Sequence, residues 1–456
     1  MMPLPVQSSP AREGGATSAR PSRASDRAGP RRGLRRSPGA QKALVFATGP
    51  LGERLAGPEI RALQFADALK SNYEVTLMAQ RAIRHDRDGV PVVPASREML
   101  IRQAIRNDVI VSPCLPPYLL LLKHVLGFVA ISDKYDPYEV ELVALQSERH
   151  DRELRIRAFS LAVDLRCADA VLCAAEQQRA NLIAAARELE RHGQALPLDP
   201  VVVPFGIPDP PPVSHRRPLR TKFPQIGDDD TVVLWWGAVW RWLDAETPIR
   251  AFAAIAKSRP DLKLVITSGS PPSANNQRFE AVTEARQLAS DLGVLDQNVL
   301  FLDEWVPYEQ RWDYLREADI GLTLHRFSTE AELAARSRYM DYLSAALPCV
   351  LGRGDQAAAE FEACGFATLV DHHEPLELAK TILSLADDPA RLRMASEAGR
   401  RLAAERHLSV AAEKLHGAVA AALTRQQHPV SSRRPLALAE AAGSYYAHKL
   451  AGRILA

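Results

Sequence analysis

The stretch that decides the fold runs from His325 to Asp355 and reads HRFSTEAELAARSRYMDYLSAALPCVLGRGD. A buried strand is predicted directly before it, at 320–324. A helix is predicted at about 332–346, and it ends there because proline at position 348 disfavours helix in the residue before it. A second buried strand follows at 349–351. Strand, polar loop, helix and strand in this order are typical of α/β proteins, in which ligands bind at helix starts along the carboxyl edge of a parallel sheet.

Five charged side chains in this stretch point to a ligand. Glu330 and Glu332 stand in the loop, and Arg336, Arg338 and Asp341 lie on the predicted helix. Carboxylates bind hydroxyl groups and arginine forks bind phosphate oxygens, so the set suits a nucleotide-sugar. The alternatives are a solvated surface helix and, for the two arginines, salt bridges to neighbouring acids.

The composition is that of a soluble globular protein of two or three domains. The chain has 456 residues, of which 46% are hydrophobic and 25% charged, and its formal net charge is +2. This small charge gives no indication of a nucleic-acid partner. The five cysteines form no Cys-x-x-Cys pair, which favours free thiols in a reducing, cytoplasmic compartment. No apolar run approaches the roughly 20 residues needed to span a bilayer.

The two ends of the chain differ from the rest. Residues 1–40 are basic and carry almost no large apolar side chains, so a disordered tail is predicted. Its arginines would allow a weak peripheral contact with the inner membrane face. A solvated tail or a misassigned start codon is the alternative. Residues 426–456 are predicted to form a polar break and an amphipathic helical tail.

Between these ends, two successive sets of alternating strands and helices are predicted. The proline-rich run 208–212 joins them as a stiff linker. The pattern predicts an α/β protein with two doubly wound, Rossmann-like domains at 41–207 and 208–425. Their carboxyl edges are expected to face each other across a cleft, which is the default place for a ligand.

The first domain offers its own candidates at strand ends. A loop with Gly49, Gly52 and Gly57 follows the first strand, but it lacks the Gly-x-Gly-x-x-Gly spacing and is a weak signal alone. Asp133 follows the strand predicted at 128–132. An acid at this point is placed either to meet a substrate or to cap the next element.

With these features the chain resembles the retaining nucleotide-sugar glycosyltransferases of the GT-B fold, family-four type. The resemblance covers about 42–420. NVLFLDEWVPYEQRWDYLREADIGLTLHRF at 298–327 is similar to the strand, "V-P" turn, helix and "A-D" strand series of that family, and MDYLSAALPCVLGRGD is similar to its "L-E-A-M-A-x-G-x-P-V" helix and strand. VVVPFGIPDPPP resembles the usual end of the first domain, and GAVWRWLDAETPIRAF has the length of the "G-R-L-x-x-x-K-G" loop and helix.

The donor-site motifs depart from the family pattern, as in an atypical bacterial subgroup. Asp341 stands where the second motif glutamate holds the nucleotide ribose. Either Glu330 or Glu332 serves as the first motif glutamate, and the spacing leaves both open.

The basic pair that contacts the donor diphosphate in the family is also absent. Ala238 and Leu243 occupy those positions by count. Arg241, Arg336 or Arg338 would supply the positive charge instead.

The resemblance implies transfer of a hexose-like sugar from a nucleoside diphosphate, with retention through same-face attack and without metal or cofactor. Positive charge near the departing diphosphate would lower the barrier. The catalytic residues predicted on this basis are Arg336, Arg338, Asp133 and Glu330. The donor-binding residues predicted are Gly237, Trp240, Arg241, Ser268, Trp305, Val306, Glu332, Asp341, Gly49, Gly52 and Gly57.

Two matters stay open at this level. The acceptor is a glycan, a lipid-linked molecule or a small molecule. The alternative function is a non-catalytic nucleotide-sugar-binding protein with a regulatory or assembly role, which the missing basic pair favours.

The run Asp228-Asp229-Asp230 matches a metal-binding pattern of other sugar transferases, but its place before a strand favours a solvated turn.

Overall fold

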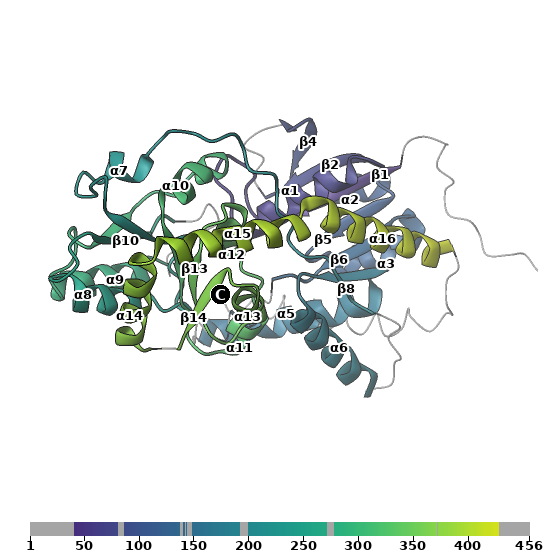
Figure 1. Cartoon of the computed structure of the whole chain (residues 1–456). Helices are drawn as coiled ribbons and strands as arrows, with labels where there is room; N and C mark the ends of the chain where they lie inside the picture. The colour runs from purple at the N-terminus through teal and green to yellow at the C-terminus, as the bar shows by residue number, and fades with distance from the viewer. Residues whose placement is uncertain are drawn as a thin grey trace, which may run out of the picture.

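Two parallel sheets, each covered by helices on both faces, form two domains (Figure 1). The computed structural model describes residues 41–80, 86–136, 140–141, 143, 148–191, 199–270, 278–371 and 373–427. The tail predicted at 1–40 and the helix predicted after 427 lie outside these residues. None of the helices described is long and apolar enough to cross a bilayer.

The first sheet has the strand order β3-β4-β2-β1-β5-β6-β7-β8, and every pairing except β3 with β4 is parallel. Its strands are β1 (Lys42–Ala47), β2 (Glu74–Ala79), β3 (Asp86–Arg87), β4 (Val90–Pro94), β5 (Val109–Ser112), β6 (Val129–Asp133), β7 (Ala170–Cys173) and β8 (Val201–Val202). Its helices are α1 (Gly57–Leu69), α2 (Arg97–Arg106), α3 (Pro117–Leu126), α5 (Glu148–Cys167) and α6 (Glu176–Arg191). The central strands are buried along their length, as expected for a sheet with both faces covered.

The second sheet has the order β11-β10-β9-β12-β13-β14 and is parallel throughout. Its strands are β9 (Thr231–Trp235), β10 (Leu262–Thr267), β11 (Val299–Leu302), β12 (Ile320–Thr323), β13 (Cys349–Gly352) and β14 (Ala367–Val370). Counted from β9, this is the 3-2-1-4-5-6 order of dinucleotide-binding domains, whose ligands bind where the strand order reverses. That point lies between β9 and β12.

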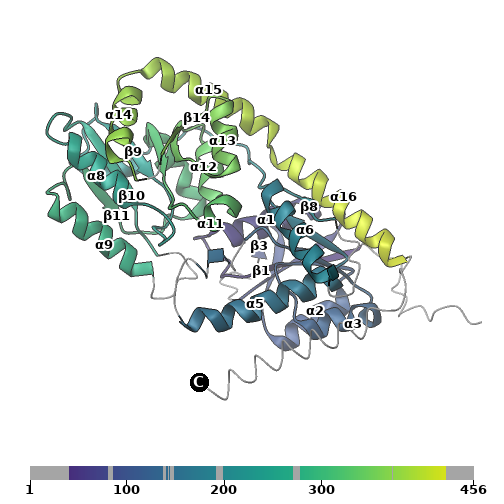
Figure 2. The same cartoon turned by 90° about the horizontal axis from the view of Figure 1, so that it is seen from below.

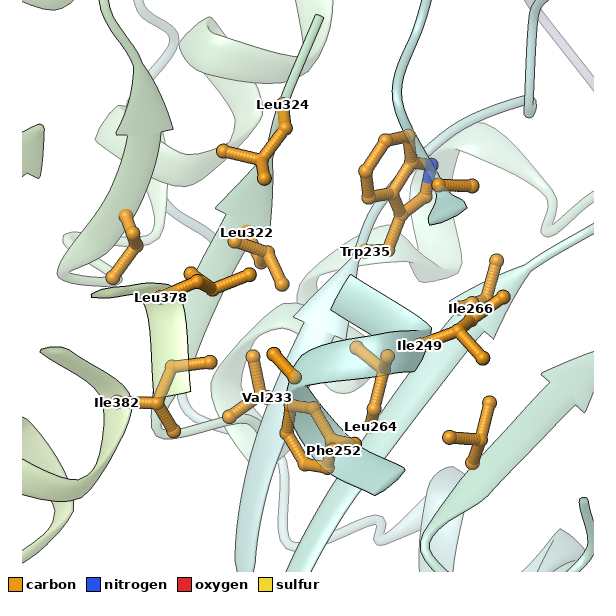
Figure 3. Packing of buried hydrophobic residues seen from close by; sticks show 14 of the residues in the cluster. Val233, Trp235, Ile249, Phe252, Leu264, Ile266, Leu322, Leu324, Leu378 and Ile382 are labelled. Atoms are coloured by element: carbon orange, nitrogen blue, oxygen red, sulfur yellow. The ribbon is translucent and has the colours of Figure 1, made fainter. Parts of the chain in front are cut away.

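Helices cover both faces of this second sheet. They are α7 (Pro218–Lys222), α8 (Glu246–Ile255), α9 (Arg278–Asp291), η1 (Tyr308–Gln310), α10 (Arg311–Glu317), α11 (Thr329–Leu333), α12 (Ser337–Ser344), α13 (Gln356–Ala363), α14 (Pro375–Ala386) and α15 (Pro389–Glu405). On one face, Val233 and Leu322 pack against Phe252 of α8 and Ile382 of α14 (Figure 3). This core fixes the strand ends that carry the site.

The helix predicted at about 332–346 is two helices, α11 and α12. The Gln178 side chain of the first domain donates a hydrogen bond of 2.8 Å to the Leu333 carbonyl oxygen. This carbonyl ends α11, and Ala334 continues with extended backbone. A contact from a distant part of the chain therefore accompanies a break that the local pattern did not predict.

The chain crosses between the domains twice, and the crossings are hydrogen-bonded to each other. The Ile207 amide donates to the Arg406 carbonyl at 2.8 Å, and the Leu408 amide donates to the Ile207 carbonyl at 3.0 Å. The last described helix, α16 (Leu408–Gln427), then buries Leu415 and Val419 in the core of the first domain beside α1 (Figure 2). The predicted domain 208–425 included these residues, because an amphipathic helix shows the same apolar period whichever domain it covers.

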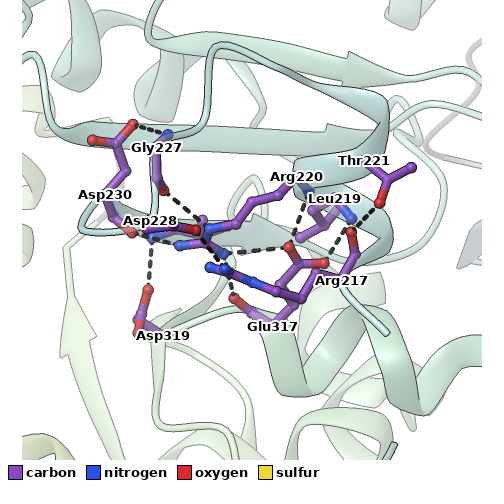
Figure 4. A network of polar contacts seen from close by, with 10 residues as sticks. Arg217, Leu219, Arg220, Thr221, Gly227, Asp228, Asp230, Glu317 and Asp319 are labelled. Carbon is purple, nitrogen blue, oxygen red and sulfur yellow. Dashed lines mark hydrogen bonds and ion pairs between the residues drawn. The ribbon is translucent and has the colours of Figure 1, made fainter. Parts of the chain in front are cut away.

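The aspartate run before β9 belongs to a network of polar contacts (Figure 4). Asp228 pairs with Arg217 at 2.5 Å, and the Asp230 carboxylate accepts a hydrogen bond of 2.9 Å from the Gly227 amide. Arg220 pairs with Glu317 at 3.3 Å in the same network. The network lies at the amino end of β9, which is the opposite end of the strand from the predicted ligand edge.

Candidate functional site

A cavity of about 490 Å³ lies between the carboxyl edges of the two sheets. Its walls come from the loops that follow the strands. The residues that follow successive strands and line it are Thr48 after β1, Tyr135 after β6, Trp236 after β9, Gly269 after β10, Glu304 after β11 and Glu330 after β12. The cleft between two domains that the sequence predicts is therefore present.

Arg338, on α12, carries a buried positive charge to this cavity. Its side chain is 9% exposed, and its Nη2 donates a hydrogen bond of 2.9 Å to the Ala238 carbonyl oxygen. Within the described residues, Nη1 has no hydrogen-bond partner and no carboxylate lies within ion-pair distance. Burial lowers the pKa of Arg338 to about 10, so the group is still charged at neutral pH. A buried cation without a counter-ion favours an anionic ligand.

Glycine at position 237 makes room for this guanidinium. The backbone there has a φ of 86°, in the left-handed region. A Cβ at Gly237 would lie only 3.4 Å from the Cζ atom of Arg338. The loop after β9 and the start of α12 therefore approach closely at one wall of the cavity.

Arg336 also lines the cavity, but its charge is already compensated. Its Nη1 donates a hydrogen bond of 3.0 Å to Glu330 Oε1, and its Nη2 donates one of 3.0 Å to Glu330 Oε2. Burial acts to lower the pKa of Arg336, but Glu330, Tyr339 and Asp355 together outweigh it, and the pKa is raised. The salt-bridge alternative thus describes Arg336 and not Arg338. Glu332 is exposed and does not line the cavity, so Glu330 is the loop acid placed at the site.

Asp341 reaches the cavity one turn further along α12. Its carboxylate accepts hydrogen bonds from Trp236 Nε1 at 3.0 Å and from Arg311 Nε at 3.2 Å. Burial raises the pKa of Asp341, although Arg311 and Trp236 act in the opposite direction. The two donors hold the carboxylate at a fixed place in the wall.

The tryptophan-rich loop after β9 forms another part of the wall. Trp240 lines the cavity and stacks on the buried Trp242 ring, with centroids 4.6 Å apart and an interplanar angle of 17°. Arg241 lies at the rim, where its half-exposed guanidinium pairs with Glu280 of α9. Trp240 thus presents a fixed flat surface to a ligand.

The loops after β10 and β11 meet beside the cavity. Trp305 and Val306 line it, and Trp305 Nε1 donates a hydrogen bond of 2.9 Å to the Leu55 carbonyl oxygen of the first domain. Ser268, predicted to bind the donor, does not line the cavity. Its one hydroxyl proton is shared between the Leu302 carbonyl oxygen at 3.1 Å and the Asp303 carboxylate at 2.8 Å. The structure thus places Ser268 in a contact between neighbouring loops.

Asp133 is likewise absent from the cavity wall. Its carboxylate accepts hydrogen bonds of 2.6 and 2.8 Å from Nε and Nη2 of Arg61, and both side chains are buried. The structure thus places the Asp133 carboxylate as the counter-ion of a buried arginine. A strand-end position was insufficient because it gave no indication of Arg61, which is 72 residues away.

Of the three predicted glycines in the first domain, one lines the cavity. It is Gly57, at the start of α1. Gly49 packs instead against Glu59, since a Cβ there would lie 2.0 Å from the Glu59 Oε1 atom. The Gly52 carbonyl accepts a hydrogen bond of 2.9 Å from Arg87. Gly49 and Gly52 thus shape the loop without contributing to the wall.

Trp236, Arg311 and Tyr135 are among the lining residues that the sequence did not indicate. Trp236 and Arg311 hold Asp341, and Tyr135 stands two residues after Asp133. Arg311 lies in a charged run that is typical of a surface helix, so its local pattern gave no signal. Tyr135 had one available signal, its place directly after the carboxyl end of β6.

These features define the class of fold. Two Rossmann-like parallel sheets whose carboxyl edges face a common cavity constitute the GT-B fold of glycosyltransferases. HepE of Anabaena, solved with UDP-glucose, matches with a TM-score of 0.62 and 15% identity over 83% of this chain and 99% of that one. Sucrose-phosphate synthase of Thermosynechococcus elongatus matches with a TM-score of 0.58 and 17% identity, over 86% of this chain and 100% of that one. WaaG, a glycosyltransferase involved in lipopolysaccharide biosynthesis, matches with a TM-score of 0.56 and 16% identity, over 84% of this chain and 99% of that one.

The sequence itself has a curated relative. The chain is 27% identical over 268 residues to D-inositol 3-phosphate glycosyltransferase of Thermobispora bispora. The match covers 57% of this chain and 59% of the length of that relative. No protein-family model matches the chain.

Proposed function

We propose that this protein transfers a sugar from a nucleoside diphosphate donor to an acceptor, with retention of configuration. The observation that carries the proposal is the buried guanidinium of Arg338, which faces the cavity without a carboxylate partner among the described residues. A diphosphate provides the negative charge that this group lacks. The similarity to a curated glycosyltransferase, and to a protein whose structure was solved with UDP-glucose, also supports a nucleotide-sugar donor.

The geometry suggests a role for each wall of the cavity. The diphosphate would lie against Arg338 and the start of α12, and the Asp341 carboxylate would accept the ribose hydroxyls. Glu330, fixed by Arg336, would accept hydroxyls of the sugar. As the leaving diphosphate gains negative charge, Arg338 stabilises it in a site that is already organised.

Retention by same-face attack is part of the proposal because the resemblance to the family-four glycosyltransferases implies it. The acceptor hydroxyl would attack on the face that the diphosphate leaves. Asp133, the strand-end acid of the first domain, is not placed to form a covalent sugar intermediate, because Arg61 binds both of its carboxylate oxygens.

The acceptor stays open among glycans, lipid-linked molecules and small molecules. The proposal also includes a cytoplasmic location, with weak contact of the basic residues 1–40 at the inner membrane face.

Proton NMR of the protein with UDP-, GDP- and ADP-hexoses tests turnover and stereochemistry together. We expect one donor to be consumed slowly with water as acceptor, and an α-linked donor to release the α-sugar first. Arg338→Gln serves as the control for contaminating hydrolases, because it should abolish the signal. Early release of the β-sugar would contradict retention. Binding without consumption of any donor, with or without candidate acceptors, would favour the non-catalytic binder.

A further inference from the structure

The hydroxyl of Tyr135 is a buried polar group for which the described residues supply no partner. Tyr135 follows β6 in the first domain, is 6% exposed and lines the cavity. No described residue forms a hydrogen bond with its Oη atom. A buried hydroxyl without a partner destabilises the fold, so its presence needs a reason.

The ring of Tyr135 is held in place from several sides. It packs edge to face against Phe205, with centroids 5.4 Å apart and an interplanar angle of 85°. The Arg61 guanidinium lies 5.0 Å from the ring centroid. The Tyr135 carbonyl accepts a hydrogen bond of 2.6 Å from Gln178, whose side chain also bonds to the Leu333 carbonyl of the second domain. The hydroxyl is therefore presented in one fixed direction.

That direction leads to the place where two helix starts meet. A Cβ built at Gly57, the first residue of α1, would lie 3.8 Å from Tyr135 Oη and 3.4 Å from Ser337 Oγ. Ser337 is the first residue of α12, the helix that carries Arg338. Helix starts favour negative charge, and Arg338, whose Nη1 has no hydrogen-bond partner among the described residues, lines the same cavity.

The hydroxyl is suited to donate a hydrogen bond, because it keeps its proton. Burial raises the pKa of Tyr135 well above its ordinary value, and the carboxylates of Asp136 and Asp133 act in the same direction. At neutral pH the oxygen keeps its proton. A phosphate oxygen is an acceptor that would satisfy it.

We propose that Tyr135 is a donor-binding residue whose hydroxyl donates a hydrogen bond to the outer phosphate of the bound donor. This inference rests on the proposed function. It adds a contact from the first domain to a phosphate that the second domain would hold. The bound donor thereby links the two domains, and its leaving group is oriented from both sides.

Tyr135→Phe tests this because it removes only the hydroxyl and keeps the ring. We expect the free variant to unfold at the same temperature as the wild type or at a higher one. Its affinity for UDP, GDP or ADP, whichever the wild type binds, should fall about ten-fold or more, as for a lost hydrogen bond to a charged group. Affinity for the matching nucleoside monophosphate, which lacks the outer phosphate, should stay unchanged. Calorimetric titration and thermal unfolding measure the two quantities.

Tyr339→Phe is the matched control. Its buried hydroxyl donates a hydrogen bond of 3.0 Å to the Asp355 carboxylate, and Tyr339 does not line the cavity. This variant should lose thermal stability and keep its diphosphate affinity.

The outcomes separate the two proposals. If the wild type binds a diphosphate and Tyr135→Phe binds it equally well, the role of Tyr135 is overturned and the function stands. A lower unfolding temperature for Tyr135→Phe, or equal losses for mono- and diphosphate, would show a structural role and also overturn it. A wild type that binds none of the nucleotides would overturn both.

Discussion

Arg338→Gln is expected to weaken nucleoside diphosphate binding by about 2–5 kcal/mol, which is about 30-fold or more. The change removes the charge that has no carboxylate partner in the described structure, while the amide keeps a donor near the Ala238 carbonyl. The free protein should be at least as stable as the wild type, because a buried charge without a counter-ion is costly. Isothermal titration and thermal unfolding of the same preparation measure both effects.

Two further variants sharpen this test. Arg338→Lys keeps the charge but loses the planar fork, so it should recover part of the affinity. Arg353→Gln is the control, because Arg353 is half-exposed, pairs with Asp371 at 2.9 Å and does not line the cavity. Equal affinity of Arg338→Gln and the wild type would show that the diphosphate lies elsewhere.

Asp133→Leu is expected to lower the free energy of unfolding by about 3–5 kcal/mol, because it leaves Arg61 buried without its counter-ion. The Arg61 and Asp133 side chains are 1% and 5% exposed, so water cannot replace the lost carboxylate. A double variant, Arg61→Met with Asp133→Leu, should regain most of the loss, since apolar side chains of similar size fill the same space. Urea unfolding of the three proteins measures these differences.

Asp371→Leu gives the scale for an ordinary surface pair. Its carboxylate is 64% exposed and contacts Arg353, so its loss should cost about 0–1 kcal/mol. If Asp133→Leu were as stable as the wild type but inactive, Asp133 would be a catalytic acid and the structural account of it would be wrong.

Much of the fold could be predicted from the sequence because it depends on local pattern. The strands at 320–324 and 349–351 are short apolar runs bounded by polar residues, and the structure places β12 and β13 there. The break between α11 and α12 was missed because the local pattern gives no signal of it, and the contact that accompanies it comes from Gln178, which is 155 residues away from Leu333. The same limit applies to α16, since its apolar face does not reveal which domain it covers.

The sequence indicated which charged residues lie at the site, but not the role of each of them. Arg336 and Arg338 are two residues apart and were equivalent from spacing alone. The structure separates them because the loop brings Glu330 to Arg336, while Arg338 turns toward Ala238. A charge pair between distant or non-helical positions has no periodic signal, so sequence reasoning identified the charges and not their partners.

A crystal structure with the nucleotide-sugar that the NMR assay shows to be consumed tests the central claim most directly. We predict that the diphosphate contacts Arg338 at the start of α12, with the ribose against Asp341 and the sugar beside Glu330. A nucleotide bound outside the cavity, or one whose diphosphate lies at the rim near Arg241 and away from Arg338, would contradict the account.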